Sequence, residues 1–111
     1  MRKNKVPDEL RGSSEFGAYF SSLDKESELY QKIINNLNLL KGNMLIGNKI
    51  EKKKWPKVYV TKYEIYNLFR METGKESRLI YTILAENEKK IVIVLEFFSS
   101  HKDYERRFGY S

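Results

Sequence analysis

RLIYTILAENEKKIVIVLEFF, residues 78–98, decides the fold of this 111-residue chain. Residues 78–85 and 90–98 are rich in β-branched and aromatic residues, which is typical of β-strands. The polar sequence ENEK between them has the length of a hairpin turn. The second segment is apolar almost throughout, which indicates a strand buried on both faces or packed beneath helices. We therefore predict an antiparallel pair of strands in the C-terminal half of the chain.

The segments upstream complete the predicted fold. IYNLFRM (65–71) has the same strand-like composition and precedes the turn sequence TGKE, so three sequential strands form an antiparallel meander. Further upstream the period becomes helical: Asp24 can cap a helix that Gly42 ends, and a shorter helix is expected over residues 15–22. We predict an α+β fold in which an N-terminal helical hairpin packs on a three- or four-stranded antiparallel sheet, with a short C-terminal helix or tail.

Length and composition indicate one domain and exclude several classes of protein. We expect a flexible polar and basic arm over residues 1–14 and a single domain over residues 15–111. No apolar run approaches the roughly 20 residues that span a bilayer, and the start lacks the apolar stretch of a signal peptide. There is no cysteine and one histidine, and cofactor-binding glycine motifs are absent. We expect a soluble, cytoplasmic protein without a metal, a cofactor or a membrane partner.

The positive charge is concentrated in one segment. The net charge is +6, and KIEKKKWPKVYVTK (49–62), which we call the lysine run, holds six lysines against one glutamate. Such a run favours a polyanionic partner, and the interleaved Trp55, Tyr59 and Tyr63 are able to stack on nucleic-acid bases. The alternative is a solvated lysine face on an ordinary loop. Pro56 forbids a continuous helix through the run and permits a short one that starts there.

Three side chains are able to take part in catalysis or ligand binding, and each also has a purely structural interpretation. Arg78 opens the central strand, where an arginine either pairs with a nearby acid such as Glu72 or Glu76 or holds a phosphate with its planar donor fork. His101 follows the last strand among cations and tyrosines, and it is either a proton donor or part of a solvated end. Glu51 lies inside the lysine run and is either a base or a salt-bridged surface acid.

A set of Glu, Lys, Arg, His and Tyr side chains is sufficient to cleave RNA without a metal. The 2′-hydroxyl supplies the nucleophile, so the protein needs only a base, an acid and cations around the phosphorus. The same set also serves a protein that binds nucleic acid without cleaving it.

The order of these segments resembles the RelE/ParE toxin superfamily. The likeness covers roughly residues 23–110, through LDKESELYQKIINNLNLLKGNMLIGNKI, NLFRMETGKESRLIYTI and IVIVLEFFSSHKDYERRFGY. Its most specific pieces are RLIYTI at 78–83 and the tail SHKDYERRFGY. The resemblance implies a type II toxin that cuts mRNA on the ribosome and is neutralised by a small antitoxin. The superfamily also includes members that poison DNA gyrase, and the His/Tyr tail favours the nuclease branch.

Carried over by position, the resemblance implies roles for individual residues. Arg78 matches the phosphate-binding arginine of the central strand, and His101 with Lys102 matches the end of the last strand. Tyr104 or Tyr110 matches the C-terminal tyrosine. Family members place basic residues or a glutamate base where this chain has Lys49, Glu51 and Lys52 to Lys54.

We therefore expect a ribosome-dependent mRNA endonuclease with Glu51 or a neighbouring lysine as base, Arg78 on the phosphate and His101 or Tyr110 as acid, with Tyr104 as a further catalytic candidate. The RNA-binding residues expected beside them are basic: Lys49, Lys52, Lys53, Lys54, Lys57, Arg70, Lys102, Arg106 and Arg107. The expected partners are mRNA on the ribosome and a cognate antitoxin, and a homodimer is a further option. The alternatives are a non-catalytic nucleic-acid-binding protein and a gyrase-inhibiting toxin.

Overall fold

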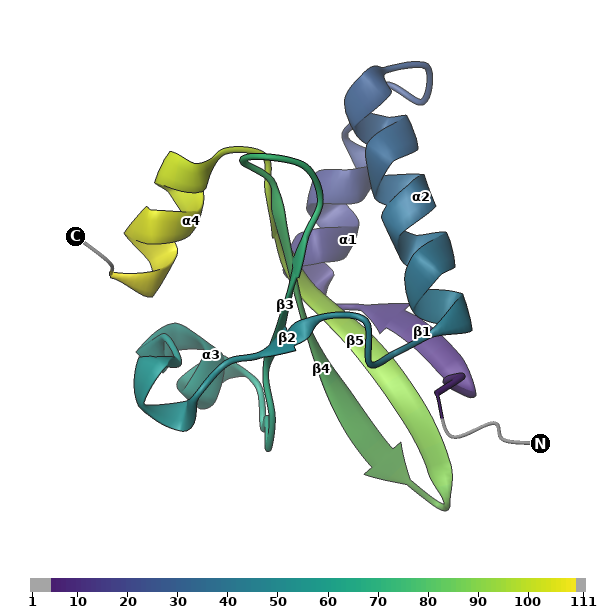
Figure 1. The fold of residues 1–111 in the computed structure, drawn as a ribbon, viewed down its shortest axis with the longest axis vertical. Helices are drawn as coiled ribbons and strands as arrows, with labels where there is room; N and C mark the ends of the chain where they lie inside the picture. The colour runs from purple at the N-terminus through teal and green to yellow at the C-terminus, as the bar shows by residue number, and fades with distance from the viewer. Residues whose placement is uncertain (1–4, 110–111) are drawn as a thin grey trace.

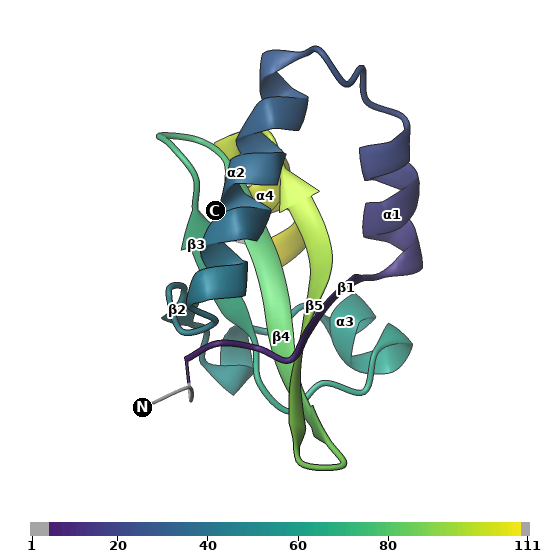
Figure 2. The same ribbon diagram turned by 90° about the vertical axis from the view of Figure 1, so that its right-hand side faces the viewer.

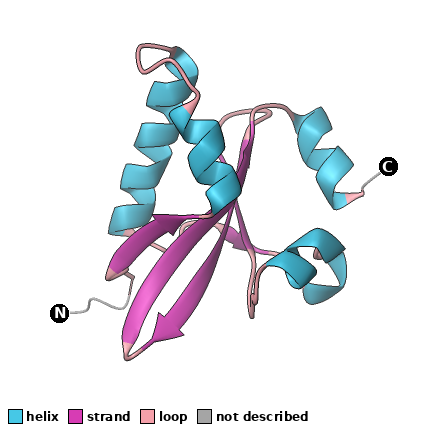
Figure 3. Ribbon diagram, turned by 180° about the vertical axis from the view of Figure 1, so that it is seen from behind, coloured by secondary structure: helices cyan, strands magenta, loops and turns pink. Residues whose placement is uncertain are grey.

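A five-stranded mixed sheet organises residues 5–109, the part of the chain that the computed structural model describes (Figure 1). The strand order across the sheet is β1-β5-β4-β3-β2. The strands are β1 (Glu9–Gly12), β2 (Asn48–Lys49), β3 (Phe69–Glu72), β4 (Arg78–Glu86) and β5 (Lys89–Phe98). Over the same residues four α-helices flank the sheet, so the predicted α+β class is confirmed (Figure 3). The helices are α1 (Ser14–Ser21), α2 (Glu28–Gly42), α3 (Lys57–Lys62) and α4 (His101–Phe108).

The predicted antiparallel meander is confirmed. β4 pairs with both β3 and β5 in antiparallel register. Asn87 and Glu88 join β4 to β5, and both have positive φ (51° and 66°), as a tight turn of mirror-image type requires. β3 is shorter than predicted because Asn67 pairs through its side chain: its amide accepts from Ile83 N (2.8 Å) and donates to Ile83 O (2.9 Å).

The N-terminal segment was predicted wrongly, and so was the sheet, which has five strands and mixed direction instead of three or four antiparallel strands. Residues 9–12, expected in a flexible arm, form β1, which pairs in parallel with β5 and makes the sheet mixed. Ser13 fixes the junction with α1, because its hydroxyl donates to Leu95 O (2.7 Å) and accepts from Phe16 N (3.0 Å). Residues 1–4 lie outside the described part of the chain.

Helices α1 and α2 cover one face of the sheet (Figure 2). The predicted helix over residues 15–22 is confirmed within one residue. The second helix starts at Glu28 rather than after Asp24, because Ser27 is the residue whose hydroxyl accepts from Tyr30 N (3.1 Å). Asp24 instead accepts from Glu26 N and forms a tight turn before the helix.

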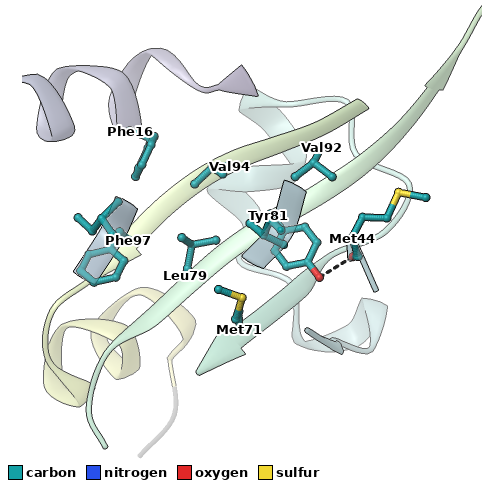
Figure 4. Close-up of a cluster of buried hydrophobic side chains, with 10 residues drawn as sticks. Phe16, Met44, Met71, Leu79, Tyr81, Val92, Val94 and Phe97 are labelled. Atoms are coloured by element: carbon teal, nitrogen blue, oxygen red, sulfur yellow. Dashed lines mark hydrogen bonds between the residues drawn. The ribbon is translucent and has the colours of Figure 1, made fainter. Parts of the chain in front are cut away.

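The side chains that form the core between these helices and the sheet are apolar apart from the hydroxyl of Tyr81. Tyr81 is fully buried, and its hydroxyl donates to Met44 O at 2.7 Å (Figure 4). The same hydroxyl accepts from Gly47 N at 2.9 Å. Burial raises the pKa of this phenol. The two hydrogen bonds hold the loop between α2 and β2 against the sheet. The buried members of this core are Phe16, Ile33, Leu40, Met44, Met71, Leu79, Tyr81, Val92, Val94 and Phe97.

Helices α3 and α4 lie over the opposite face, which we call the α3/α4 face (Figure 1). Pro56 precedes α3, as predicted, and a 3₁₀ turn over Lys52–Lys54 comes before it. The second core beneath them contains Ile50, Tyr59, Leu68, Ile80, Leu95, Phe98, Tyr104 and Phe108. The prediction that 90–98 is buried on both faces is confirmed, because β5 contributes side chains to both cores.

A β-bulge near the end of β5 shapes the α3/α4 face. Ile80 pairs with Glu96 and Tyr81 pairs with Val94, so Leu95 is an extra residue in its strand. The bulge breaks the alternation of side chains at this point. Leu95 packs in the second core, and the neighbouring Glu96 also reaches groups of α3 and α4.

Candidate functional site

Two arginines and a glutamate from adjacent strands project from the α3/α4 face. Arg70 and Glu72 are two residues apart on β3, so their side chains leave the same face, and Glu72 pairs directly with Arg78 on β4. One carboxylate oxygen, Glu72 Oε2, lies 3.9 Å from the Nε atoms of both Arg70 and Arg78. We call Arg70 and Arg78 the arginine pair. The sequence indicated both arginines, and it indicated Glu72 only as an acid near Arg78.

Tyr104 of α4 covers the arginine pair. The Cζ atoms of Arg70 and Arg78 each lie 5.8 Å from the centre of the Tyr104 ring, and Arg70 Nη1 donates to the Tyr104 hydroxyl at 2.9 Å. This geometry is that of cations over an aromatic face. Tyr104 is 1% exposed, so the contact is screened from solvent.

The sequence around α4 explains why the helix forms at this place. Ser100 caps its N-terminus by accepting from Asp103 N (3.1 Å), and Gly109 ends it with a φ of 73°, a left-handed conformation that favours glycine. Tyr104 and Phe108, four residues apart, form the buried side of the helix. The predicted C-terminal helix or tail is therefore a helix up to Phe108.

The side chain of Arg78 is buried, and its Nε–H donates to no described residue. Its side chain is 10% exposed, and its Nη1 donates to the carbonyl oxygens of Ser77 (2.9 Å) and Lys75 (3.4 Å). Its Nε–H makes no hydrogen bond to any residue that the structure describes, because Glu72 stands too far away. A buried donor without an acceptor costs about 1–3 kcal/mol, so an anion that approached this nitrogen would be stabilised.

His101 borders this cluster at the start of α4. Its ring centre lies 6.1 Å from that of Tyr104, and its Nδ1 lies 3.2 Å from Glu105 Oε2. The imidazole is about half exposed, so it is accessible to a ligand on this face. Lys102, the next residue, is exposed as well.

Part of the lysine run lies next to Arg70. Lys49, Glu51, Lys54 and Arg70 line a small cavity of about 100 Å³ together with Ile50. Glu51 Oε1 lies 3.7 Å from Lys54 Nζ, so the carboxylate expected as a base forms an exposed ion pair. The remaining lysines of the run that were expected to bind RNA are exposed: Lys52, Lys53 and Lys57.

The aromatic residues of the run are not arranged for stacking on bases, which corrects that expectation. Tyr59 is 1% exposed, and its hydroxyl donates to Glu96 Oε1 at 2.6 Å. Trp55 is half-buried and donates to Ile50 O at 2.9 Å. Tyr63 is half-buried too, and its hydroxyl is bound to Glu15 of α1. Among the Phe, Tyr and Trp side chains of residues 5–109, the exposed one is Tyr66, which follows the run; it is 80% exposed, and sequence reasoning missed it.

Tyr63 belongs to a second polar contact, between α3 and α1. Its hydroxyl donates to Glu15, which also forms an ion pair with Lys62. The Lys62 ammonium and then the Tyr63 hydroxyl lower the pKa of Glu15 to about 2. Burial and the Glu15 carboxylate raise the pKa of Tyr63 to about 12.

The arginines at the end of α4 are engaged in ion pairs. Arg107 contacts both carboxylate oxygens of Glu96, through Nε (2.9 Å) and Nη2 (3.0 Å), and this bonding raises its pKa. The same carboxylate accepts the hydrogen bond from Tyr59, and burial together with Glu96 raises the pKa of that phenol. Arg106 pairs with Asp103 at 3.0 Å on the exposed side. Arg107 therefore ties α4 to the sheet.

The structure brings Arg70, Arg78, Tyr104 and His101 together and joins Lys49, Glu51 and Lys54 to them through Arg70. Tyr110, the other candidate acid, lies outside the described residues. Over residues 5–109 no three His, Asp or Glu side chains gather as metal ligands, and no helix is long and apolar enough to cross a membrane. Comparison of the chain with protein-family models, with curated proteins and with solved structures gave no match.

Proposed function

We propose that the protein is a metal-independent endoribonuclease, the toxin of a type II toxin–antitoxin system that cuts mRNA on the ribosome. The observation that carries the proposal is the gathering of the arginine pair, Tyr104 and His101 on one face of the sheet, with a lysine-lined cavity beside Arg70. These groups come from three separate elements, β3, β4 and α4.

The chemistry is an attack of the RNA 2′-hydroxyl oxygen on the adjacent phosphorus. A base takes the 2′ proton, the bond to the 5′ oxygen breaks, and an acid returns a proton to that oxygen, which leaves a 2′,3′-cyclic phosphate. Arg78 binds the phosphate, Glu51 or a neighbouring lysine is the base, and His101 is the acid. Arg70 adds positive charge at the phosphorus, where the transition state concentrates negative charge.

Tyr104 has a positioning role in this proposal. Its hydroxyl accepts from Arg70 and its ring lies against both guanidinium groups, so it holds the arginine pair in place. Its burial at 1% exposure argues against direct proton transfer to a substrate. Among the catalytic candidates, His101 is therefore preferred over Tyr104 as the acid.

The order of elements supports the RelE/ParE-like assignment. Helices α1 and α2 come before the meander, the short helix α3 lies between them and β3, and α4 follows the meander with His101 and Tyr104 on it. A toxin of this class needs an antitoxin, and a partner with acidic side chains would complement the exposed lysines of residues 49–57.

A second candidate, a nucleic-acid-binding protein without catalysis, is favoured by one observation. Arg78 is nine-tenths buried, Glu51 is paired with Lys54, and His101 Nδ1 lies 3.2 Å from Glu105 Oε2, so the proposed phosphate-binding group, base and acid are all engaged within the protein. Binding through the exposed lysines alone needs none of them.

The test is a reconstituted translation reaction to which the purified protein is added, with mRNA 5′ ends mapped by primer extension. We expect new ends inside ribosome-bound codons, lost with Arg78→Lys because lysine lacks the planar fork. Arg11→Lys is the matched control, because Arg11 is an exposed arginine on β1 that pairs with Glu9. Intact mRNA, together with retained binding of single-stranded RNA, would instead establish the second candidate.

A further inference from the structure

Glu72 occupies the position between the arginine pair where an anion would sit. Its carboxylate oxygen is 3.9 Å from the Nε of Arg70 and 3.9 Å from the Nε of Arg78, which is within ion-pair range and beyond hydrogen-bond range. The Nε–H of Arg78 is buried and donates to no described residue. A carboxylate oxygen that accepted hydrogen bonds from both guanidinium groups would lie about 2.9 Å from the donating nitrogens. Glu72 therefore attracts the arginines without using their donors.

The three side chains have different freedom to move. Arg78 is 10% exposed and is fixed by the carbonyl oxygens of Ser77 and Lys75. Arg70 is 28% exposed and is held by the Tyr104 hydroxyl. The side chain of Glu72 is 51% exposed, so it is the one member of the three that can turn into solvent without disturbing the core.

We propose that Glu72 is an internal competitor for the phosphate group of the nucleic acid, held between Arg70 and Arg78 until a phosphate displaces it. The displaced carboxylate turns outward, and one phosphate oxygen accepts from the Nε–H of Arg78. The inference rests on the proposed function only in that the same face binds RNA, because it concerns binding and not cleavage. Glu72 lowers the affinity of this site for every phosphate. A nucleic-acid strand that is held only weakly by the rest of the protein therefore does not displace it.

A merely structural role for Glu72 has different consequences. An acid between two arginines also reduces their mutual repulsion, so its removal would lower stability and leave the affinity for phosphate unchanged. In a competitor, removal of the carboxylate raises affinity, because the arginine pair no longer loses an attractive partner when phosphate binds.

The experiment measures binding of a short single-stranded oligodeoxynucleotide, which lacks the 2′-hydroxyl and stays uncut, by fluorescence anisotropy at low salt. Two partly exposed ion pairs predict that Glu72→Gln binds the probe roughly fivefold more tightly than the unaltered protein. Glu76→Gln is the matched control, because it makes the same charge change at an exposed residue of the adjacent β3–β4 loop, without an ion pair among the described residues. Its affinity is expected to change less than about twofold.

Two further arms identify the site and the ligand chemistry. In an Arg78→Lys background the gain from Glu72→Gln should disappear, because the Nε–H that the phosphate uses is gone. Inorganic phosphate, added at constant ionic strength, should displace the probe from the Glu72→Gln protein. Equal affinities for the Glu72→Gln and Glu76→Gln proteins, a gain that persists with Arg78→Lys, or no displacement by phosphate would each overturn the proposal. Thermal unfolding of each variant confirms that it is folded, and none of these readouts requires cleavage of RNA.

Discussion

Substitution of Glu96 by alanine should loosen helix α4 from the sheet. The Glu96 carboxylate accepts from Tyr59 at 2.6 Å and from two nitrogens of Arg107 at 2.9 and 3.0 Å, so one side chain joins α3, α4 and β5. It is 20% exposed, which makes these bonds stronger than those of a surface pair.

The expected loss of unfolding free energy is the sum of the costs to Tyr59 and Arg107, the two residues that lose a hydrogen-bond acceptor when the Glu96 carboxylate is removed. Tyr59 is 1% exposed, and its hydroxyl would lose its acceptor, at a cost of about 1–2 kcal/mol. Arg107 is 39% exposed and regains water, so its share is discounted to about 0.5–1 kcal/mol. We expect Glu96→Ala to destabilise the protein by about 1.5–3 kcal/mol, which lowers the Tm of a domain of this size by about 7–15 °C.

The assay is thermal and urea unfolding followed by circular dichroism. Arg106→Met is the matched control, since Arg106 belongs to the same helix and pairs with Asp103 on the exposed side, and it should cost less than about 0.5 kcal/mol. Tyr59→Phe combined with Glu96→Ala should cost less than the sum of the two single changes, because the hydroxyl and its acceptor are then removed together. A loss below about 1 kcal/mol for Glu96→Ala, or strict additivity with Tyr59→Phe, would refute this reasoning.

Three further outcomes are expected. The folded-state pKa of Glu15, about 2, lies below its ordinary value of 4.5, so its contribution is present above pH 4.5 and is lost as the pH falls toward 2; Glu15→Gln should remove that part of the pH dependence in acid titrations of stability. Gly47→Ala should cost about 1–3 kcal/mol in urea unfolding, because an added Cβ would lie 2.8 Å from the buried hydroxyl oxygen of Tyr81. Gly17→Ala has open space around it and should stabilise its helix by up to about 1 kcal/mol. Replacement of Lys52–Lys54 by serine should weaken binding of single-stranded nucleic acid and reduce the slope of log affinity against log salt by about 2, and the same replacement at Lys89 and Lys90, in the distal hairpin, should change the slope less.

The sequence predicted the meander well because its signal is local and strong. Residues 78–98 carry two strand-like segments and a turn, and nothing elsewhere in the chain competes with their pairing. β1 was missed because ELRG is only four residues long and has no β-branched residue; it is a strand only because β5 offers it an edge.

The sequence allowed us to predict which residues belong to the candidate site, but not which of them contact one another. Arg78 and Tyr104 were named from the sequence, but the role of Glu72 depends on the register that sets it opposite Arg78. Tyr59 and Tyr63 were misjudged for the same reason, since composition does not reveal which side of a short helix meets the core.

The side chain of Asn67 has a consequence for self-association. β4 extends beyond the end of β3, so the backbone of Ile83 would otherwise present an open N–H and C=O in one of the most apolar strands of the chain. The Asn67 amide occupies both groups, as a neighbouring strand would. Unprotected edges of this kind recruit strands from other molecules and seed aggregates. One asparagine therefore closes the edge of β4 at Ile83 to a strand from another molecule.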